Sequence, residues 1–261
     1  QWANVVRWEM RTRLFLRTSE FLWQEGHTAH ATENEARAEA LKILNIYKDV
    51  AENVLAIPVL TGLKSDSERF AGAVDTYCIE AMMGDKRALQ AGTSHYLGQN
   101  FARAFDVKFQ NENNIEELVY ATSWGVSTRL VGALIMVHGD DKGLRIPPKI
   151  APIQIVIIPI IKNENDLDKI NKFLDNILSI FQTNQVRYHI DNRMKISPGF
   201  KFNEWEMKGV PIRMEVGPRD MENQSVVVAR RDTGEKQTLK LDTACDIMIQ
   251  LLNEIQSNMI D

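Results

Sequence analysis

Arginines and large aromatic side chains alternate in the stretch from Arg7 to His30. It reads RWEMRTRLFLRTSEFLWQEGHTAH and also carries three glutamates and two histidines. Charged side chains are seldom fully buried unless they are paired, so this stretch is poor material for an ordinary core strand. We predict two strands, Asn4–Met10 and Phe15–Ala31, joined by a polar turn at residues 11–13. Such a hairpin could hold fixed cations over a bound anion, but an amphipathic hairpin whose arginines face water fits the pattern equally well.

Four further segments follow this stretch along the chain. They read TSHYLGQNF, SWGVSTR, MVHGD and KGVPIRMEVGPRD. Taken together, the five segments resemble the class II aminoacyl-tRNA synthetases, and among them the prolyl-tRNA synthetases closely. The first segment corresponds to motif 2 of that class and SWGVSTR to motif 3. Each segment alone would be a weak signal, but the set in this order is specific and covers essentially the whole chain.

The resemblance implies activation of proline by ATP and its transfer to the 3′ end of tRNA(Pro). The amino-acid carboxylate attacks the α-phosphate of ATP, so the protein must supply charge stabilisation and positioning rather than a general base. Guanidinium groups suit this task because they pair bidentately with phosphate oxygens. The resemblance gives the catalytic role to Arg7 and Arg129, although Arg129 could also be a surface arginine at a helix start. The implied ATP-binding residues are Arg7, Arg17, Thr18, Phe21, Gln90, Thr93 and Arg129, with Mg²⁺ accompanying the nucleotide.

Proline requires an apolar, aromatic-walled slot with a carboxylate near its imino group. The resemblance places this slot at Trp23, Glu25, His27, Phe70 and His95. In the family, a threonine–glutamate pair of the slot and motif 1, which builds a homodimer interface, come from an earlier segment. We therefore expect this chain to be the part of such an enzyme from motif 2 onward. The stretch from Arg17 to Arg129 has no room for the long editing insertion of many bacterial enzymes, which indicates the archaeal/eukaryotic type.

The sequence predicts no metal site. His27 and His30 are three residues apart, which puts them on opposite faces of a strand, and no third ligand stands at a recognisable spacing. The two cysteines, Cys78 and Cys245, cannot build a zinc site and are expected to be reduced and buried. A GxxxxGK[ST] phosphate loop is absent.

Residues 1–148 are predicted to form an antiparallel sheet with helices, the partial catalytic core of a class II synthetase. A capping box at Thr32–Glu35 starts a long amphipathic helix. The other expected elements are a strand at Val74–Met83, a loop at Ala88–Leu97, a strand at Leu118–Ser127 and a buried helix at Thr128–His138.

Residues 149–261 follow the pair Pro147-Pro148, the best boundary signal in the chain. Ile150–Ile161 is an apolar run typical of a strand buried on both faces. Strand–helix alternation predicts an α/β domain with a mostly parallel sheet, ending in a hairpin around Thr233-Gly234 and a last helix. The resemblance makes this an anticodon-binding domain with a mixed five-stranded sheet.

The resemblance implies anticodon contacts at Glu206, Arg213, Arg219 and Asp220, with Lys236 as an addition. Arginine and carboxylate side chains suit the two guanines of a proline anticodon. Arginine donates to guanine O6 and N7, whereas a carboxylate accepts from guanine N1–H and N2–H. Without the family match, a salt-bridged surface loop would be the favoured interpretation.

Composition narrows the class of protein further. The 261 residues are 44% hydrophobic and 25% charged, as in soluble globular proteins, and the net charge of −4 gives no reason to expect non-specific polyanion binding. No secretory signal or membrane-spanning run is present, so a cytoplasmic protein is expected. Two alternatives remain: another class II synthetase (threonyl, glycyl or histidyl), or a non-catalytic tRNA-binding fragment.

Overall fold

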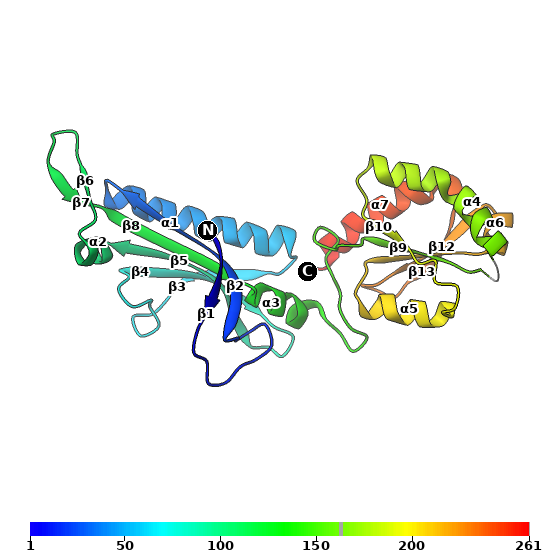
Figure 1. Cartoon of the computed structure of the whole chain (residues 1–261), viewed down its shortest axis with the longest axis horizontal. Helices are drawn as coiled ribbons and strands as arrows, with labels where there is room; N and C mark the ends of the chain where they lie inside the picture. Colours follow the sequence, from blue (N-terminus) through cyan, green and yellow to red (C-terminus); the bar gives the residue numbers. More distant parts are fainter. Residues whose placement is uncertain (162–163, 261) are drawn as a thin grey trace. The chain divides into compact units, whose positions relative to one another are not determined.

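The computed structural model describes residues 1–161 and 164–260. The chain divides into two compact units (Figure 1), and each is considered separately. The first comprises Gln1–Asn53 and Ile57–Val137, and the second comprises Val54–Ala56 and His138–Asp261. The predicted second domain, residues 149–261, includes residues 162–163 and 261, which lie outside the described part of the chain.

The first unit is built on a six-stranded sheet with the order β1-β2-β8-β5-β4-β3. All five pairings are antiparallel, as predicted. The strands are β1 (Trp2–Val6), β2 (Glu20–His30), β3 (Val59–Leu63), β4 (Asp75–Met82), β5 (Ala88–Gly98) and β8 (Tyr120–Ser127). The remaining elements are helices α1 (Glu33–Asp49), α2 (Asn100–Phe105) and α3 (Arg129–His138), a π-helical turn at Val50–Val54, and the hairpin of β6 (Lys108–Gln110) and β7 (Glu116–Leu118).

Helix α1 runs along one face of this sheet (Figure 1) and begins at the predicted capping box. The Thr32 hydroxyl accepts from the Glu35 N–H at 3.3 Å, and the Glu35 carboxylate accepts from the Thr32 N–H at 3.1 Å. Ala36 and Ala40 are fully buried, and such small side chains let the helix approach the strands closely. The capping box and the amphipathic pattern are therefore confirmed.

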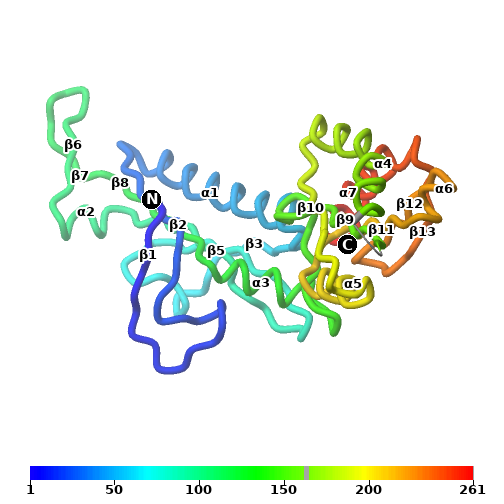
Figure 2. The backbone as a smooth tube through the Cα atoms, turned by 45° about the vertical axis from the view of Figure 1, so that its right-hand side comes forward, coloured from blue at the N-terminus to red at the C-terminus, as the bar shows by residue number. Residues whose placement is uncertain are grey.

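The N-terminal hairpin differs from its prediction. Its strands stop at Val6 and resume at Glu20, so residues 7–19 form a long loop, visible as the wide blue turn of the tube in Figure 2. Within the loop, Arg13 and Arg17 exchange backbone hydrogen bonds of 2.7 and 2.9 Å, which close a small turn of their own. The strand prediction was therefore wrong for Arg7–Met10 and Phe15–Ser19, where this turn takes the backbone away from the sheet, and correct for Glu20–His30.

The expected loop at Ala88–Leu97 is also wrong, since these residues form strand β5 in the middle of the sheet. The small and polar residues of this segment are not typical of a strand, but they allow it to pack against its neighbours. A Cβ on Gly92 would lie 2.9 Å from Val126 Cγ1. The buried Ser94 hydroxyl donates to the Ala40 carbonyl at 2.7 Å and so ties the strand to α1.

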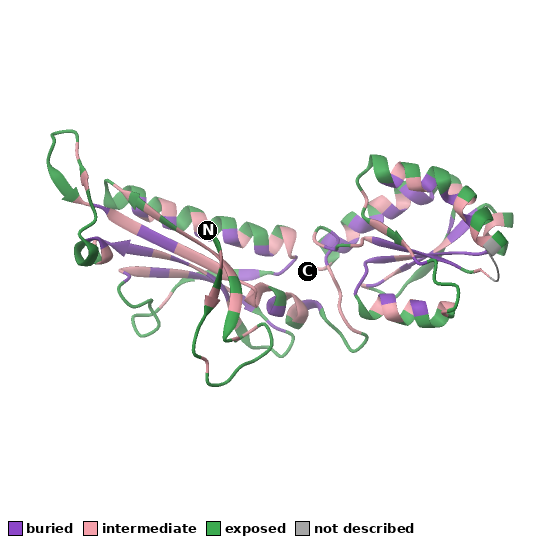
Figure 3. Ribbon diagram, in the orientation of Figure 1, coloured by how far each residue is buried: buried purple, intermediate pink, exposed green. Residues whose placement is uncertain are grey.

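Helix α3 was expected to be buried and is so only in part. Ala133 is fully buried, whereas Val131 and Met136 remain 41% and 36% exposed. The ribbon of α3 accordingly mixes buried, intermediate and exposed residues (Figure 3).

The second unit has a five-stranded sheet with the order β10-β9-β11-β12-β13. Its strands are β9 (Ile155–Pro159), β10 (Tyr188–Ile190), β11 (Ile212–Val216), β12 (Ser225–Arg230) and β13 (Lys236–Lys240). The first three strands pair in parallel and the last two pairings are antiparallel. The mixed sheet is therefore confirmed, and the expectation of a mostly parallel one was wrong because the hairpin at the end adds two antiparallel pairings.

Helices cover both faces of this sheet (Figure 1). They are α4 (Glu164–Thr183), α5 (Pro198–Met207), the short α6 (Pro218–Glu222) and α7 (Leu241–Asn258). Ile155 and Ile157 pack with α4 and α7, whereas Val156 and Ile158 pack against Trp205 of α5. Every residue of β9 is buried (Figure 3), as predicted for a strand between two layers.

Strand β9 is shorter than the predicted Ile150–Ile161. The residues before it form a loop that Arg187 holds in place: its guanidinium donates to the carbonyls of Pro148 and Ala151, both at 2.8 Å. Those carbonyls are thereby occupied outside the sheet, which explains why an apolar run does not extend the strand.

Candidate functional site

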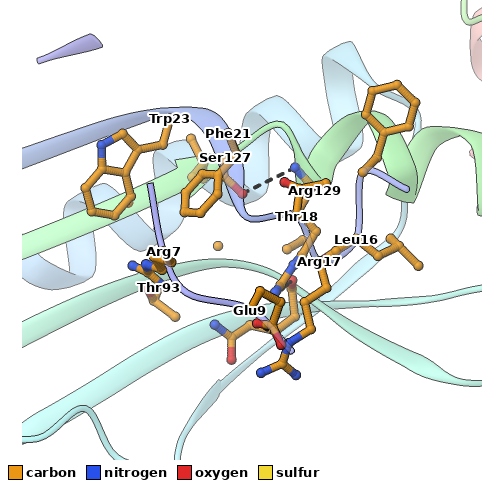
Figure 4. A pocket seen from close by; sticks show the side chains of 16 residues that line it. Arg7, Glu9, Leu16, Arg17, Thr18, Phe21, Trp23, Thr93, Ser127 and Arg129 are labelled. Atoms are coloured by element: carbon orange, nitrogen blue, oxygen red, sulfur yellow. Dashed lines mark hydrogen bonds and ion pairs between the residues drawn. The ribbon is translucent and has the colours of Figure 1, made fainter. Parts of the chain in front are cut away.

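One pocket of the first unit gathers the residues that the sequence singled out for ATP (Figure 4). The loop of residues 7–19, strands β2, β5 and β8 and the start of α3 all contribute to it. Its lining includes all seven predicted residues, Arg7, Arg17, Thr18, Phe21, Gln90, Thr93 and Arg129, together with Glu9, Phe15, Leu16, Trp23, Ala91, Gly92, Gly125, Val126 and Ser127. Two arginines of this loop, Arg7 and Arg17, thus meet Arg129 from a distant part of the chain in one cavity.

Arg129 is fixed from several sides. Its Nε–H donates to the Leu16 carbonyl at 3.0 Å and its Nη1 to the Gln90 carbonyl at 3.5 Å, while its backbone N–H donates to Ser127 Oγ at 3.2 Å. Burial lowers the pKa of Arg129, and the positive charges of Arg17 and Arg7 lower it further. A cation whose neighbours include two more cations makes this cavity attractive to an anion.

Arg7 stands against aromatic rings rather than a carboxylate. Its guanidinium carbon lies 5.3 Å from the centre of the Phe21 ring and 5.7 Å from that of Trp23. Among the described residues, neither Arg7 nor Arg129 forms an ion pair with a carboxylate. Both side chains are therefore held in place while their charge stays available to a ligand.

Arg17 is engaged differently. Its Nε donates to the Glu9 carboxylate at 2.7 Å, and this hydrogen bond lowers the pKa of Glu9. The Arg17 side chain is 64% exposed, so the pair is weak in energetic terms and a phosphate could replace the carboxylate.

A second pocket adjoins the first and gathers all five residues predicted to bind proline. The two pockets share Arg7, Trp23, Gln90, Thr93 and Gly125, and the second is completed by Glu25, His27, Lys64, Glu68, Phe70, Thr76, His95, Ser123 and Trp124. Its walls are aromatic and its carboxylates come from two separate segments. The shared residues make the two pockets direct neighbours.

The pKa of His95 departs furthest from its usual value among the residues that line the second pocket. Burial lowers its pKa to about 4, with a further contribution from the charge of Lys64. Its ring packs on Phe70 at 4.8 Å between centres, and its Nδ1 lies 3.0 Å from the Thr76 hydroxyl. His95 is therefore neutral at neutral pH and oriented by its neighbours. His27 is largely exposed and lies 3.4 Å from the Glu25 carboxylate.

The alternation of strand β2 explains how one segment serves both pockets. Phe21, Trp23, Glu25 and His27 are every second residue, so they point to the same face of the sheet. Phe21 and Trp23 line the first pocket (Figure 4), and Trp23, Glu25 and His27 line the second.

Several lining residues were not predicted, notably Glu9, Lys64 and Thr76. Thr76 lies opposite His95 in the register of β4 and β5, so its place depends on a strand pairing between separated segments. Glu9 could have been found, because it stands between Arg7 and Arg11 in the sequence and carboxylates pair well with guanidinium groups.

The residues predicted for the anticodon are brought together only in part. A pocket of the second unit is lined by Glu206 and Arg213 with the ring of Phe202. Arg213 lies over that ring at 4.4 Å and Lys236 at 5.3 Å, and both pair with Glu215, at 3.0 and 2.8 Å.

Arg219 and Asp220 lie elsewhere, in helix α6 beyond the other end of β11, and do not line that pocket. The Asp220 carboxylate accepts the Gly217 N–H at 2.8 Å and so caps its own helix. Arg219 and Asp220 therefore do not join the group formed by Glu206, Arg213 and Lys236.

Within the described residues, no three His, Cys, Asp or Glu side chains are grouped as a metal site. Cys78 and Cys245 are both buried, and burial raises the pKa of Cys245 to about 11. In the same part of the chain, none of the helices has the length and apolar character needed to cross a membrane.

Two family profiles cover most of the chain. Residues 1–138 match the tRNA synthetase class II core domain (G, H, P, S and T), and residues 154–251 match the anticodon binding domain. The chain therefore belongs to the class II aminoacyl-tRNA synthetases.

Within that class, the chain is similar over its whole length to proline–tRNA ligases. It is 58% identical over 259 residues to that of Flavobacterium psychrophilum and 59% identical over 259 residues to that of Cytophaga hutchinsonii, with 99% of this chain and 53% of each relative covered. The crystal structure of prolyl-tRNA synthetase from Cryptosporidium parvum complexed with L-proline and AMP is 45% identical, with a TM-score of 0.95 over 100% of this chain and 56% of that one. The chain thus spans about half the length of these relatives.

Proposed function

We propose that the natural protein containing this chain is a proline–tRNA ligase of the cytoplasm. It would activate L-proline with ATP to prolyl-adenylate and transfer the prolyl group to the 3′ end of tRNA(Pro), as a homodimer. The observation that carries the proposal is the pair of adjoining pockets that share Arg7, Trp23 and Thr93. The similar prolyl-tRNA synthetase of known structure was complexed with L-proline and AMP.

In the nucleotide pocket, the phosphates would lie between Arg7 and Arg129. Arg129 is the better placed of the two to act without moving, because Leu16 and Gln90 already hold its guanidinium. Arg17 would exchange Glu9 for the distal phosphates, and Phe21 would stack on adenine. Catalysis then rests on preorganised charge, which costs no reorganisation when negative charge shifts to the leaving pyrophosphate.

Mg²⁺ would enter with the nucleotide. The pocket offers the oxygens of Glu9 and Gln90, the hard donors that this ion prefers, and a nucleotide's phosphates supply further ligands, so the residues present fit. When bound, the ion would neutralise part of the charge on the phosphates.

In the second pocket, Trp23, Phe70 and His95 would enclose the ring of proline. Glu25 offers a carboxylate for the cationic imino group, and His27 lies beside it. His95 stays neutral over the physiological range because of its burial, so it would add no positive charge to repel that group.

The second unit would read the anticodon of tRNA(Pro) through Glu206, Arg213 and Lys236, with Arg219 and Asp220 as further proposed contacts. Arg213 and the Phe202 ring offer a stacking surface, and Glu206 offers an acceptor for guanine N1–H and N2–H.

Proline-dependent ATP–pyrophosphate exchange by the natural full-length protein tests the proposal. We expect exchange with proline and none with threonine, glycine or histidine in parallel reactions. Exchange with one of those and not with proline would assign the chain to another synthetase. Binding of tRNA without exchange of any amino acid would make it a non-catalytic relative.

A further inference from the structure

The loop Asp140–Leu144, here called the linker loop, lies directly against the C-terminal end of helix α5. The Leu144 N–H donates to the Met207 carbonyl at 2.9 Å. Gly143 has φ +125°, and a Cβ at this position would lie 2.5 Å from the Met207 carbonyl oxygen. Only glycine allows so close an approach in this conformation, so the contact is specified by the sequence.

Arg231 joins the linker loop to Glu206. Its two terminal nitrogens donate to both carboxylate oxygens of Asp140, at 2.8 and 2.6 Å, while its Nε donates to the Glu206 carbonyl at 2.9 Å. The Arg231 side chain is only 5% exposed. A planar guanidinium with three such bonds has a single orientation, and its neighbour Asp140 has a pKa held well below the usual range by this pairing.

The side chain of Glu206 is engaged from the same loop. Lys142 approaches its carboxylate at 3.2 Å, at the edge of the pocket that also holds Arg213. The Glu206 carbonyl is therefore contacted by Arg231, besides the Gly209 N–H at the end of α5, and the Glu206 carboxylate is contacted by Lys142 of the linker loop. Hydrogen bonds weaken steeply with misalignment, so an acceptor that must meet two donors on a base edge gains from such placement.

We propose that Asp140 and Arg231 are positioning residues that set Glu206 for reading an anticodon guanine. The inference deepens the proposed function and rests on it, because it takes Glu206 as the group that meets the base. Asp140 itself touches no nucleotide in this scheme. It acts through Arg231 and also through Lys142, whose backbone N–H donates to the Asp140 carboxylate at 2.9 Å.

The test uses the natural full-length protein with tRNA(Pro) transcripts. Asp140→Asn keeps the size of the side chain but turns an amide N–H₂ toward the Arg231 guanidinium, so one of the two charge-assisted bonds is lost. We expect KM for tRNA in aminoacylation to rise about tenfold, the equivalent of one such bond. Proline-dependent pyrophosphate exchange, which needs no tRNA, should stay within about twofold of wild type. Asp141→Asn is the matched control, since this neighbouring carboxylate is exposed and has no ion pair among the described residues.

A double-mutant cycle with Glu206→Gln separates positioning from a general structural effect. We expect Glu206→Gln to raise KM for tRNA and to reduce discrimination against a transcript whose anticodon guanine is replaced by adenine. In that background, adding Asp140→Asn should change KM by less than about twofold, because both changes act on one contact.

Four outcomes overturn parts of the scheme. Full additivity of the two substitutions, or equal losses in exchange and aminoacylation by Asp140→Asn, would show that Asp140 only supports the fold. A normal KM with Asp140→Asn, while Glu206→Gln is impaired, would refute the positioning role alone. A Glu206→Gln variant with normal KM and discrimination would instead refute the proposed anticodon role of Glu206.

Discussion

Replacing Arg129 tests the central claim about the nucleotide pocket. Its guanidinium donates Nε–H to the Leu16 carbonyl at 3.0 Å and Nη1–H to the Gln90 carbonyl at 3.5 Å, and the side chain lines the cavity. A lysine at this position has one ammonium group on a flexible stem, so it cannot hold the loop and face a phosphate at the same time. Arg129→Lys therefore removes the fixed geometry, and Arg129→Ala removes the charge as well.

The magnitude follows from the two roles. Losing one preorganised donor to transition-state charge costs about 10²–10³ in rate, or about 2.7–4 kcal/mol. We expect a loss of about 10² in kcat/KM for exchange with Arg129→Lys and of about 10³ with Arg129→Ala. Leu16 is half-buried in a mostly exposed loop, so water can reach its freed carbonyl, and the free energy of unfolding should change by no more than about 1 kcal/mol.

The assay is proline-dependent pyrophosphate exchange by the full-length protein, with tRNA binding measured separately. Arg13→Lys serves as the control, because Arg13 is an exposed arginine of the same loop that does not line the pocket. We expect the control to exchange normally and all variants to bind tRNA(Pro) as wild type does. Wild-type exchange by Arg129→Lys, or equal loss of exchange and tRNA binding by Arg129→Ala, would refute the reasoning.

Three further predictions concern stability. A Cβ in Gly26→Ala would overlap the ring of Trp124, so thermal unfolding should show a loss of about 2 kcal/mol; an unchanged midpoint would contradict the packing. Asp191→Asn should cost about 3 kcal/mol in denaturant unfolding, because it leaves the buried Lys201 cation without a counter-charge; a loss below about 1 kcal/mol would argue against the ion pair. The pKa of His95 is lowered from 6.5 to about 4 by burial, so the unfolded chain binds the proton more tightly and stability should fall as pH drops from about 6.5 to about 4. His95→Asn should flatten that part of a titration of unfolding free energy, and an equal slope in both proteins would show that another group titrates.

The sequence predicted those elements whose pattern depends on residues within the element itself. The capping box at Thr32 and the spacing of Ala36, Ala40, Leu44 and Tyr47 are properties of one helix, and α1 appeared where they placed it. Strand β5 was missed because its residue types are set by contacts with other elements. Gly92 is small to admit Val126, and Ser94 is polar to reach a carbonyl of α1, so no strand-like composition remains.

The candidate site divides along the same line. Its arginines and aromatics stand in recognisable segments, and the resemblance of those segments placed them. Other side chains of the candidate sites are oriented by partners that lie far away in the sequence. The Asp140–Arg231 pair beside Glu206 joins residues 91 apart, and Thr76 meets His95 only through strand register. No periodicity or motif connects such residues, because their contact is created by the fold.

The alternation of β2 has a consequence for how this protein can change. Phe21 serves the first pocket, Glu25 and His27 serve the second, and Trp23 serves both, all from one face of one strand. A deletion of one residue before Phe21 could be absorbed by the loop, but a deletion between Phe21 and Trp23 would turn one set of these side chains to the opposite face. Both pockets therefore depend on the same alternation of side chains along β2. Variation in ligand preference must therefore come from substitutions at these positions, because a change in strand length would separate the nucleotide end from the amino-acid end.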